Sequence, residues 1–323
     1  MDGLDRIRGM LAGVALGDTL GAPLEFKHNS DKKYTGYIEF KTTWNTRAGK
    51  KELAIGQFTD DTEMTLTLMR SLIENNGYDK EEVILSYMNW ANSTWSLGRN
   101  TRALLKGIKT LKGYYTRFNG MRKTKEFKNN QSNGCLMRAT PLIFFHDACE
   151  QDTTITNIHP VCINSVKVYI RILRYLYAGH DTSSIMTRIH KYITAPSLRN
   201  IYEKALLGDE PNMDENKGFI LHAMWLIFFI LDNLGTIFTT FEDTIDWVID
   251  SHRGSDTDTN AAIVGGMLGI YFGLEKMLME EKTAYNFPII INRNRKESKT
   301  PRDKRYMLTD FYKLTENYYN ISS

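Results

Sequence analysis

The sequence is poor in cysteine. Only three occur among 323 residues, at Cys135, Cys149 and Cys162, and no two of them form a CxxC pair. Such a sparse, odd-numbered set excludes a disulfide framework and a cysteine-based zinc site. This usage is typical of proteins from a reducing compartment, so we expect a cytoplasmic protein.

Long hydrophobic runs are also missing. The most apolar stretch, FILHAMWLIFFIL at 219–231, contains His222 and is shorter than the roughly 20 residues that cross a bilayer. We expect it to form a helix buried inside a soluble protein. The first residues, MDGLDRIRGMLAG, start acidic and lack an apolar core, so we expect no secretory signal there. No membrane partner is predicted.

Positive charge is present only in small excess. The net charge is +3 and the pI is about 8.5. This mild basicity is compatible with an anionic ligand but is too weak to indicate nucleic-acid binding. The basic run NRNRKESKTPRDKR at 292–305 lacks interleaved aromatic residues, so we expect a solvated loop and not a nucleic-acid arm.

Strand-like alternation is scarce. It occurs only in YTGYIEFKTTW at 34–44, where a hairpin or extended loop is expected, whereas apolar residues elsewhere recur at three- and four-residue spacing. The pattern predicts an all-α fold, a compact orthogonal bundle of about ten or more helices. No linker rich in proline, glycine or serine divides the chain. We expect one domain over 1–290, with a basic loop and a closing helix at 291–323 packed on it.

Three glycines recur at four-residue spacing near the end of the predicted core. Gly265, Gly269 and Gly273 would lie on one face of a helix. Because a glycine has no side chain to hold a neighbour away, this face predicts close packing against another helix.

The first acidic motif is GQFTDDTEMTL at 56–66, which places Thr59, Asp60 and Asp61 just before an apolar helical stripe. One interpretation is helix capping, with Asp60 as the N-cap and Glu63 closing a capping box. The other is a set of oxygen ligands.

The second acidic motif, RGSDTDTNAAI at 253–263, repeats this arrangement. Asp256 and Asp258 are two residues apart and would point to different sides of a regular helix. They converge only in a turn before the helix, where Gly254 permits unusual dihedral angles. Capping by Ser255 or Asp256 is again the alternative.

Together the two motifs suit a pair of hard divalent cations. Carboxylate and hydroxyl oxygens favour Mg²⁺, Mn²⁺ or Ca²⁺ over zinc or copper. Asp60, Asp61, Asp256 and Asp258 bring four negative charges, which two divalent ions would balance. Without a cation, crowded carboxylates repel one another and take up protons.

Two further segments could contribute. In VALGDTLGAPLEF at 14–26, a glycine-bracketed aspartate ends the predicted first helix and Glu25 follows a proline; a glycine C-cap is the structural alternative. In SNGCLMRATPL at 132–142, Asn133–Gly134 opens a predicted helix, and a helix N-terminus can bind phosphate. A plain turn is the alternative reading of that dipeptide.

These segments carry a family resemblance. In order, DRIRGMLAGVALGDTLGAPLEF, GQFTDDTEM, GRNTRALL, SNGCLMRATPL and RGSDTDTNAAIVGGMLGIYFG resemble the ADP-ribosylglycohydrolases, which include the dinitrogenase-reductase-activating and ADP-ribosyl-acceptor hydrolase types. The match runs in blocks over about residues 4–275. The resemblance implies an all-α fold with a dinuclear Mg²⁺ or Mn²⁺ centre at the bottom of a cleft. It also implies cleavage of the bond between C1″ of ADP-ribose and an acceptor.

The resemblance also assigns roles to residues. The implied metal ligands are Thr59, Asp60, Asp61, Asp256, Asp258 and Thr259, with Asp258 bridging the two ions. The implied catalytic residues are Glu25, near the scissile bond, with Asp60, Asp61 and Asp258. The implied substrate-binding residues are Gly98, Ser132, Asn133, Gly134, Cys135 and His159. Asn133–Gly134 matches the loop near the diphosphate, and His159 matches a residue that lines the cleft, although it could simply open a helix before Pro160.

The expected partner is an ADP-ribosylated protein or a small ADP-ribosyl conjugate. A nucleic acid would be a partner only if it carried ADP-ribose. We expect a monomer.

Two positions depart from the family pattern. Ser96 stands where the nitrogenase-regulating members usually carry an acidic residue, and Ser255 replaces a glycine of the usual GGDTDT. Neither change removes a predicted ligand. They motivate an alternative from another class, an ADP-ribose-binding or structural protein that has lost catalysis.

Two other enzyme classes fit the residues less well. An isoprenoid synthase would need an acid at position 64 for its DDxxD motif, where this chain has Met64. A phosphohydrolase built on His146–Asp147 and His180–Asp181 lacks an evident set of further ligands.

Overall fold

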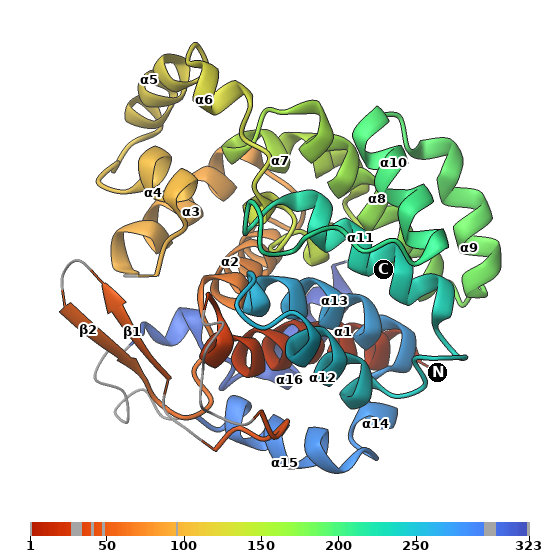
Figure 1. Ribbon diagram of the computed structural model, residues 1–323. Coiled ribbons are helices and arrows are strands. Elements are labelled where there is room, and N and C mark those ends of the chain that lie inside the picture. The colour runs from red at the N-terminus through yellow and green to blue at the C-terminus, as the bar shows by residue number, and fades with distance from the viewer. Residues whose placement is uncertain are drawn as a thin grey trace.

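The fold was determined from a computed structural model, which describes residues 2–26, 34–39, 42–46, 49–94, 96–293 and 302–321. Within these ranges the regular secondary structure is helical apart from one two-stranded hairpin, so the predicted all-α fold is confirmed (Figure 1). The helices are α1 Gly3–Gly21, α2 Asp60–Glu74, α3 Lys80–Ser93, α4 Arg99–Leu105, α5 Leu111–Met121, α6 Lys125–Lys128, α7 Cys149–Thr156, α8 Pro160–Tyr177, α9 Thr182–Ile189, α10 Pro196–Leu207, α11 Ile220–Asn233, α12 Phe241–Ser251, α13 Thr257–Phe272, α14 Leu274–Met277, α15 Glu281–Ile291 and α16 Phe311–Asn320. Short 3-10 turns occur at Ala22–Leu24, Asn133–Cys135, Thr140–Leu142, His146–Ala148, His190–Tyr192 and Lys304–Tyr306.

Helices α1 and α13 form the centre of the molecule and run antiparallel along most of their length (Figure 1). A Cβ atom built on Gly13 would lie 2.0 Å from the carbonyl oxygen of Gly265, and one built on Gly9 would lie 2.2 Å from that of Gly269. Backbone therefore touches backbone. The predicted close packing of Gly265 and Gly269 is confirmed, and Gly273 forms the C-cap of α13 at a φ of 74°.

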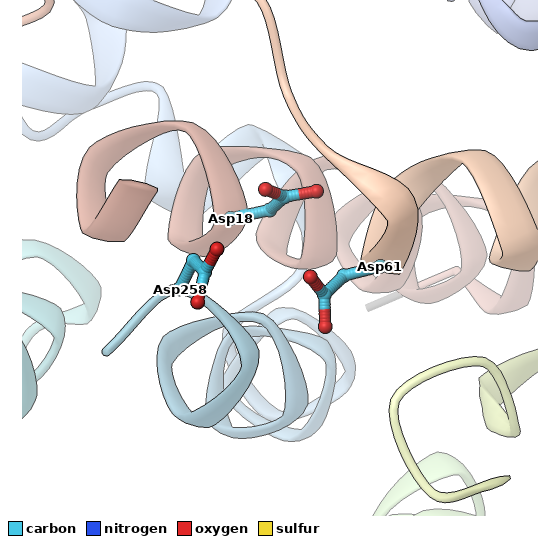
Figure 2. Close-up of side chains that lie close together, drawn as sticks. All are labelled: Asp18, Asp61 and Asp258. Atoms are coloured by element: carbon cyan, nitrogen blue, oxygen red, sulfur yellow. The ribbon is translucent and has the colours of Figure 1, made fainter. Parts of the chain in front are cut away.

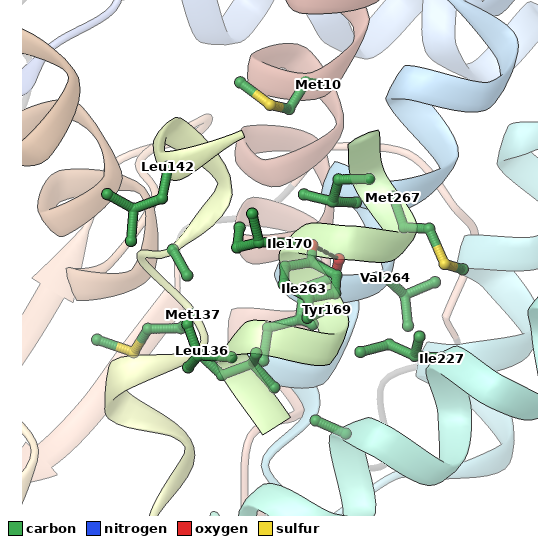
Figure 3. Packing of buried hydrophobic residues seen from close by; sticks show 14 of the residues in the cluster. Met10, Leu136, Met137, Leu142, Tyr169, Ile170, Ile227, Ile263, Val264 and Met267 are labelled. Atoms are coloured by element: carbon green, nitrogen blue, oxygen red, sulfur yellow. Dashed lines mark hydrogen bonds between the residues drawn. The ribbon is translucent and has the colours of Figure 1, made fainter. Parts of the chain in front are cut away.

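The remaining helices cover this central pair. Helices α8, α11 and α12 pack on α13, while α2, α15 and α16 pack on α1. Figure 3 shows the core between them, where Tyr169 of α8 donates a 2.7 Å hydrogen bond to the carbonyl oxygen of Ile263. The apolar stretch 219–231 lies mainly in α11, and Trp225 and Phe228 are fully buried there, so the predicted buried helix is confirmed. None of the described helices has the length and apolarity needed to cross a membrane.

Two element boundaries differ from the prediction. The hairpin consists of β1 Thr42–Thr46 and β2 Gly49–Leu53, paired antiparallel with Thr42 opposite Leu53, so it begins later than the alternation at 34–44 indicates. The closing helix, which the apolar pattern of YMLTDFYKLTENYY at 306–319 predicts from Tyr306 onward, begins at Phe311, because the Asp303 carboxylate caps a separate 3-10 turn at Lys304–Tyr306. Most of the predicted basic loop, 294–301, lies outside the described residues.

Candidate functional site

An aspartate of the central helix α1 determines how α2 begins. The Asp18 carboxylate accepts hydrogen bonds from the backbone N–H groups of Thr59 and Thr62, each at 3.0 Å. It also accepts from both threonine hydroxyls, at 2.8 and 2.7 Å. These N–H groups belong to the first turn of α2, where a helix needs an external acceptor. Asp18 therefore caps α2 from another helix.

This arrangement corrects the capping interpretation of both motifs. The N-cap residue of α2 is Thr59 and not Asp60, and its side chain makes no capping bond. Glu63 points elsewhere, to Trp90 and Arg302, so there is no capping box. Asp256 does occupy the N-cap position of α13, but its side chain makes no capping bond either. The acidic side chains at both helix starts are thus available for another role.

The two acidic motifs meet in space. Asp18, Asp61 and Asp258 each offer a carboxylate oxygen, and these three atoms lie within 4.8 Å of one another (Figure 2). Glu25, Asp256 and Asp258 form a second group that satisfies the same limit. Asp258 belongs to both groups, which is the position that a bridging ligand would need. We call these five residues the acidic site.

Close packing of α1 on α13 creates this convergence. A Cβ atom on Gly21 would lie 2.6 Å from Cα of Asp258, and one on Gly17 would lie 2.1 Å from the carbonyl oxygen of Ala261. Gly17 and Gly21 therefore serve helix contact. The predicted glycine C-cap is wrong, since α1 continues through Gly21.

Four of the five residues of the acidic site are buried, Glu25 is half-buried, and Asp61 is short of hydrogen-bond donors. Asp61 and Asp258 are 2% and 3% exposed. Asp61 Oδ1 is buried without a hydrogen-bond partner among the described residues. The Thr59 hydroxyl lies 2.8 Å from Asp18 Oδ1 and 3.0 Å from Asp61 Oδ2, but it has one hydrogen to give. One of these two carboxylates must then hold a proton or face a cation.

Burial and mutual repulsion shift the titration of these groups. Burial raises the pKa of Asp18 and of Asp256 to about 6 in each case, although hydrogen bonds from threonine or Asn133 oppose the shift. Burial, followed by the charges of neighbouring carboxylates, raises the pKa of Glu25, Asp61 and Asp258 well above the usual values. Bringing these carboxylates together as anions is therefore costly in the absence of positive charge.

The donor set fits hard divalent cations. Every candidate ligand atom in the two groups is a carboxylate oxygen, and the unpartnered Oδ1 of Asp61 lies among them. Such oxygens are the ligands that Mg²⁺ and Mn²⁺ prefer. The residues present therefore suit the metal pair that the sequence motifs indicate.

Three predicted metal ligands take different positions around this site. Asp60 lies outside both groups of three; its carboxylate accepts from the Ser96 hydroxyl at 2.8 Å and from the Gly98 N–H at 3.4 Å. Thr59 is held by Asp18, and the Thr259 side chain hydrogen-bonds to Asp256. Ser96 is therefore linked to the edge of the site by its hydrogen bond to Asp60.

The loop at 132–135 lies against the second acidic corner. Asn133 Nδ2 donates a 2.6 Å hydrogen bond to Asp256 Oδ2, and the Asn133 N–H donates to the carbonyl oxygen of Gly218 at 2.9 Å. Asn133–Gly134 opens only a 3-10 turn, so the predicted helix start is wrong. The Gly134 carbonyl accepts a 2.8 Å hydrogen bond from the Arg138 guanidinium, and the Leu136 N–H donates to the Asn133 carbonyl at 2.7 Å in the 3-10 pattern.

Other predicted substrate contacts have local partners. Ser132 accepts a hydrogen bond from Asn157, and Cys135 is buried beside the Ser132 carbonyl. His159 caps α8, because its Nδ1 accepts from the Val161 N–H at 3.2 Å, and partial burial lowers its pKa. This is the helix-opening role, and a contact of His159 with substrate stays a prediction.

The second departure, Ser255, fits its turn. Its hydroxyl donates a 2.7 Å hydrogen bond to the His252 carbonyl, while Gly254 takes the positive φ of 84° that the turn requires. The Ser255 carbonyl accepts from the Phe26 N–H at 3.1 Å, which ties the segment after Glu25 to this corner.

Sequence reasoning did not assign Asp18 to the site. The sequence feature that could have identified Asp18 is the pair of flanking glycines in GDTLG, because they mark a helix face whose backbone contacts another helix. An aspartate beside such a face is buried, and a buried carboxylate needs donors or a cation.

Comparisons with known proteins identify the family of this chain. A model of the ADP-ribosylglycohydrolase family matches residues 1–283. The ADP-ribosyl-dinitrogen reductase glycohydrolase of Rhodospirillum rubrum is 24% identical over 283 residues, covering 84% of this chain and 87% of that protein. The ADP-ribosylarginine hydrolase Tri1 of Serratia proteamaculans is 25% identical over 311 residues, covering 87% of this chain and 77% of that protein. A solved structure titled ADP-ribosylglycohydrolase-related protein complex matches with a TM-score of 0.70 at 19% identity, covering 99% of each chain. The chain belongs to the ADP-ribosylglycohydrolase family.

Proposed function

We propose that this protein is a metal-dependent ADP-ribosyl hydrolase. It would cleave the bond between C1″ of ADP-ribose and an acceptor with the help of two Mg²⁺ or Mn²⁺ ions. The observation that carries the proposal is the meeting of two acidic groups that share Asp258. Relatives named as hydrolases of ADP-ribosylated dinitrogen reductase and of ADP-ribosylarginine support the reaction class.

The residues of the acidic site would hold the metals. Asp61, Asp256 and Asp258 offer carboxylate oxygens, with Thr59, Asp60 and Thr259 beside them. Asp18 fixes Thr59 and the first turn of α2 through its hydrogen bonds. When bound, such a metal pair orients the ribose hydroxyls and lowers the pKa of a water molecule.

Proton transfer would fall to carboxyl groups of this chain. Glycoside cleavage passes through an oxocarbenium-like state and needs one group to protonate the leaving atom. Burial, followed by the charge of Asp256, raises the pKa of Glu25 well above its usual value, and in this proposal Glu25 would deliver the proton to the departing acceptor. Asp61 Oδ1, free of hydrogen bonds from the described residues, can accept the proton of the attacking water.

Substrate binding would use the loop beside the second corner. Asn133 already orients Asp256, and the Gly98 N–H points to Asp60, so both lie where a bound ribose or diphosphate would contact the site. The acceptor is an ADP-ribosylated protein side chain or a related conjugate. We propose a monomeric, cytoplasmic enzyme.

The test is a hydrolysis assay with defined linkages. Arginine-, serine- and DNA-linked ADP-ribose are each incubated with the protein in Mg²⁺, in Mn²⁺ and in EDTA. We expect release of ADP-ribose from at least one linkage in metal and none in EDTA. Asp258→Asn should lower the rate of hydrolysis by at least a thousandfold. The control Asp243→Asn removes one negative charge as well, but at an exposed position on α12, and should leave the rate unchanged.

The same samples distinguish an enzyme from a binding protein. If no linkage is cut under any metal condition while ADP-ribose raises the melting temperature, the hydrolase proposal is wrong and a binding role on this fold replaces it.

A further inference from the structure

A second hollow lies along α8, apart from the acidic site. It encloses about 460 Å³ and is bounded by α7, α8 and the segment at 190–194. Its charged and aromatic lining consists of four cations, two carboxylates and two rings: Lys167, Arg171, Arg174, Lys191, Asp147, Glu150, His146 and Tyr192. Asp147 lies 3.3 Å from His146. We call it the α8 groove. None of its lining residues belongs to the acidic site or is hydrogen-bonded to it.

The cations of the α8 groove exceed its anions. Lys167 pairs with Glu150 at 2.6 Å. Arg171 instead lies 3.6 Å from the centre of the Tyr192 ring, and Lys191 Nζ lies 5.2 Å from the same centre. Among the described residues, no carboxylate is within ion-pair distance of Arg171, Arg174 or Lys191.

The helix presents its charges in a row. Lys167, Arg171 and Arg174 are spaced by four and then three residues, which places them on one face of α8. Like charges at this spacing destabilise a helix slightly. Arg171 and Arg174 of this row, together with Lys191 across the groove, have no carboxylate partner among the described residues, so an anion in the groove would be favourable.

The wall opposite α8 is held firmly. The Asn164 side chain, 8% exposed, donates from Nδ2 to the Tyr192 carbonyl at 2.9 Å. Its Oδ1 accepts from the Thr194 and Ala195 N–H groups, each at 2.9 Å. The groove is therefore shaped before any ligand arrives, and this lowers the entropic cost of binding.

The local field is positive. Desolvation acts to raise the pKa of the Tyr192 hydroxyl, but the charges of Arg171 and Lys191, together with hydrogen bonds from Tyr175 and Lys191, lower it overall. The same field attracts an anionic ligand.

We propose that the α8 groove binds a ligand carrying two or more phosphate groups, of the size of a nucleoside diphosphate. Arginine guanidinium groups match phosphate oxygens in a bidentate fashion, and the volume lies in the range of small-ligand sites. Two arginines and a lysine can neutralise a diphosphate, and Tyr192 offers an aromatic edge for an attached base. The site does not depend on the proposed hydrolase activity.

Calorimetric titration of inorganic pyrophosphate into the full chain tests this site. Bound metal is first removed with EDTA, and the EDTA is then removed by dialysis, so that neither a metal ion in the acidic site nor the chelator, itself a polyanion, competes for pyrophosphate. The groove variant Arg171→Gln/Lys191→Gln removes two positive charges. The control Lys204→Gln/Lys276→Gln removes two positive charges elsewhere on the protein. Lys204 pairs with Asp209, and Lys276 lies over the Phe272 ring.

We expect pyrophosphate to bind the wild type and the control equally, and the groove variant at least tenfold more weakly. Raising the salt concentration should weaken pyrophosphate binding to the wild type and to the control, because salt screens exposed charges. Repeating the titration with ADP identifies the source of affinity: equal affinity supports recognition of phosphate alone, and tighter binding supports a packed base.

Three results would overturn the proposal. The first is no measurable binding of pyrophosphate at millimolar concentration. The second is equal binding by the groove variant and the wild type. The third is displacement of pyrophosphate by a hexaglutamate peptide at equal concentration, which would assign the groove to an acidic protein segment instead. None of these results bears on hydrolysis at the acidic site.

Discussion

Replacing Gly17 with alanine tests whether contact between α1 and α13 positions the acidic site. The added Cβ atom would lie 2.1 Å from the Ala261 carbonyl oxygen and 2.8 Å from the Ala262 nitrogen, whereas ordinary contact begins at 3.4 Å. The obstructing atoms are backbone, so no side chain can rotate out of the way. The two helices must separate by about 1 Å.

The expected loss of stability follows from these distances. Overpacking a dense core costs typically about 1–3 kcal/mol, and contact with rigid backbone belongs at the upper end. Alanine in place of glycine returns about 1 kcal/mol of helix propensity. We expect a net loss of about 2 kcal/mol. Because metal ligands tolerate displacements of only about 0.2 Å, the affinity for Mn²⁺ should fall at least tenfold.

Urea denaturation followed by circular dichroism, and calorimetric titration with Mn²⁺, measure the two effects. Gly120→Ala is the matched control, since Gly120 lies exposed in α5 with no atom within 4 Å of the added Cβ. It should stabilise the protein slightly and leave Mn²⁺ affinity unchanged. If Gly17→Ala matches this control in both measurements, the helix contact does not position the site.

Three further predictions concern the surroundings of the site. In EDTA the melting temperature should fall as pH rises from 4 to 7. The pKa of Asp18 and of Asp256 is about 6 in the folded protein and near 3.9 in the unfolded chain, so protonation stabilises the fold fully below pH 3.9 and this stabilisation is lost as pH rises through 6. A melting temperature that rises over this range would contradict the argument. Arg302→Met should lower the free energy of unfolding by about 3–5 kcal/mol in urea titrations, because the buried Glu63 carboxylate, 2.6 Å from Arg302 Nε, loses its counter-charge. Ser96→Ala removes a 2.8 Å hydrogen bond to Asp60 and should lower kcat about fivefold with little change in KM; an unchanged kcat would place Ser96 outside the reaction.

Local patterns in the sequence predicted much of the fold. Apolar spacing identified the helices, and the recurring Gly265 and Gly269 correctly predicted a helix in close contact with another. The partner, α1, could not be identified from spacing alone, since it lies about 250 residues earlier in the chain. The same limitation hid Asp18, whose role depends on donors from α2.

The candidate site was predicted in kind but not in detail. Two acidic clusters at helix starts indicated metal ligands, and the structure brings Asp61, Asp256 and Asp258 together with Glu25. Which carboxylate faces inward depends on helix rotation about its axis, and this is set by tertiary packing. Asp60 is turned toward Ser96 and Gly98 for that reason.

Pairing of α1 with α13 also constrains how the protein is made. A ribosome releases α1 first and α13 some 235 residues later, so the first helix must wait with its glycine face uncovered through most of synthesis. Contacts of such long sequence separation form slowly. The carboxylates of Asp18 and Asp61 therefore remain apart from Asp258 until α13, in the last fifth of the chain, has folded back onto α1, so the acidic site is assembled late in the life of each molecule.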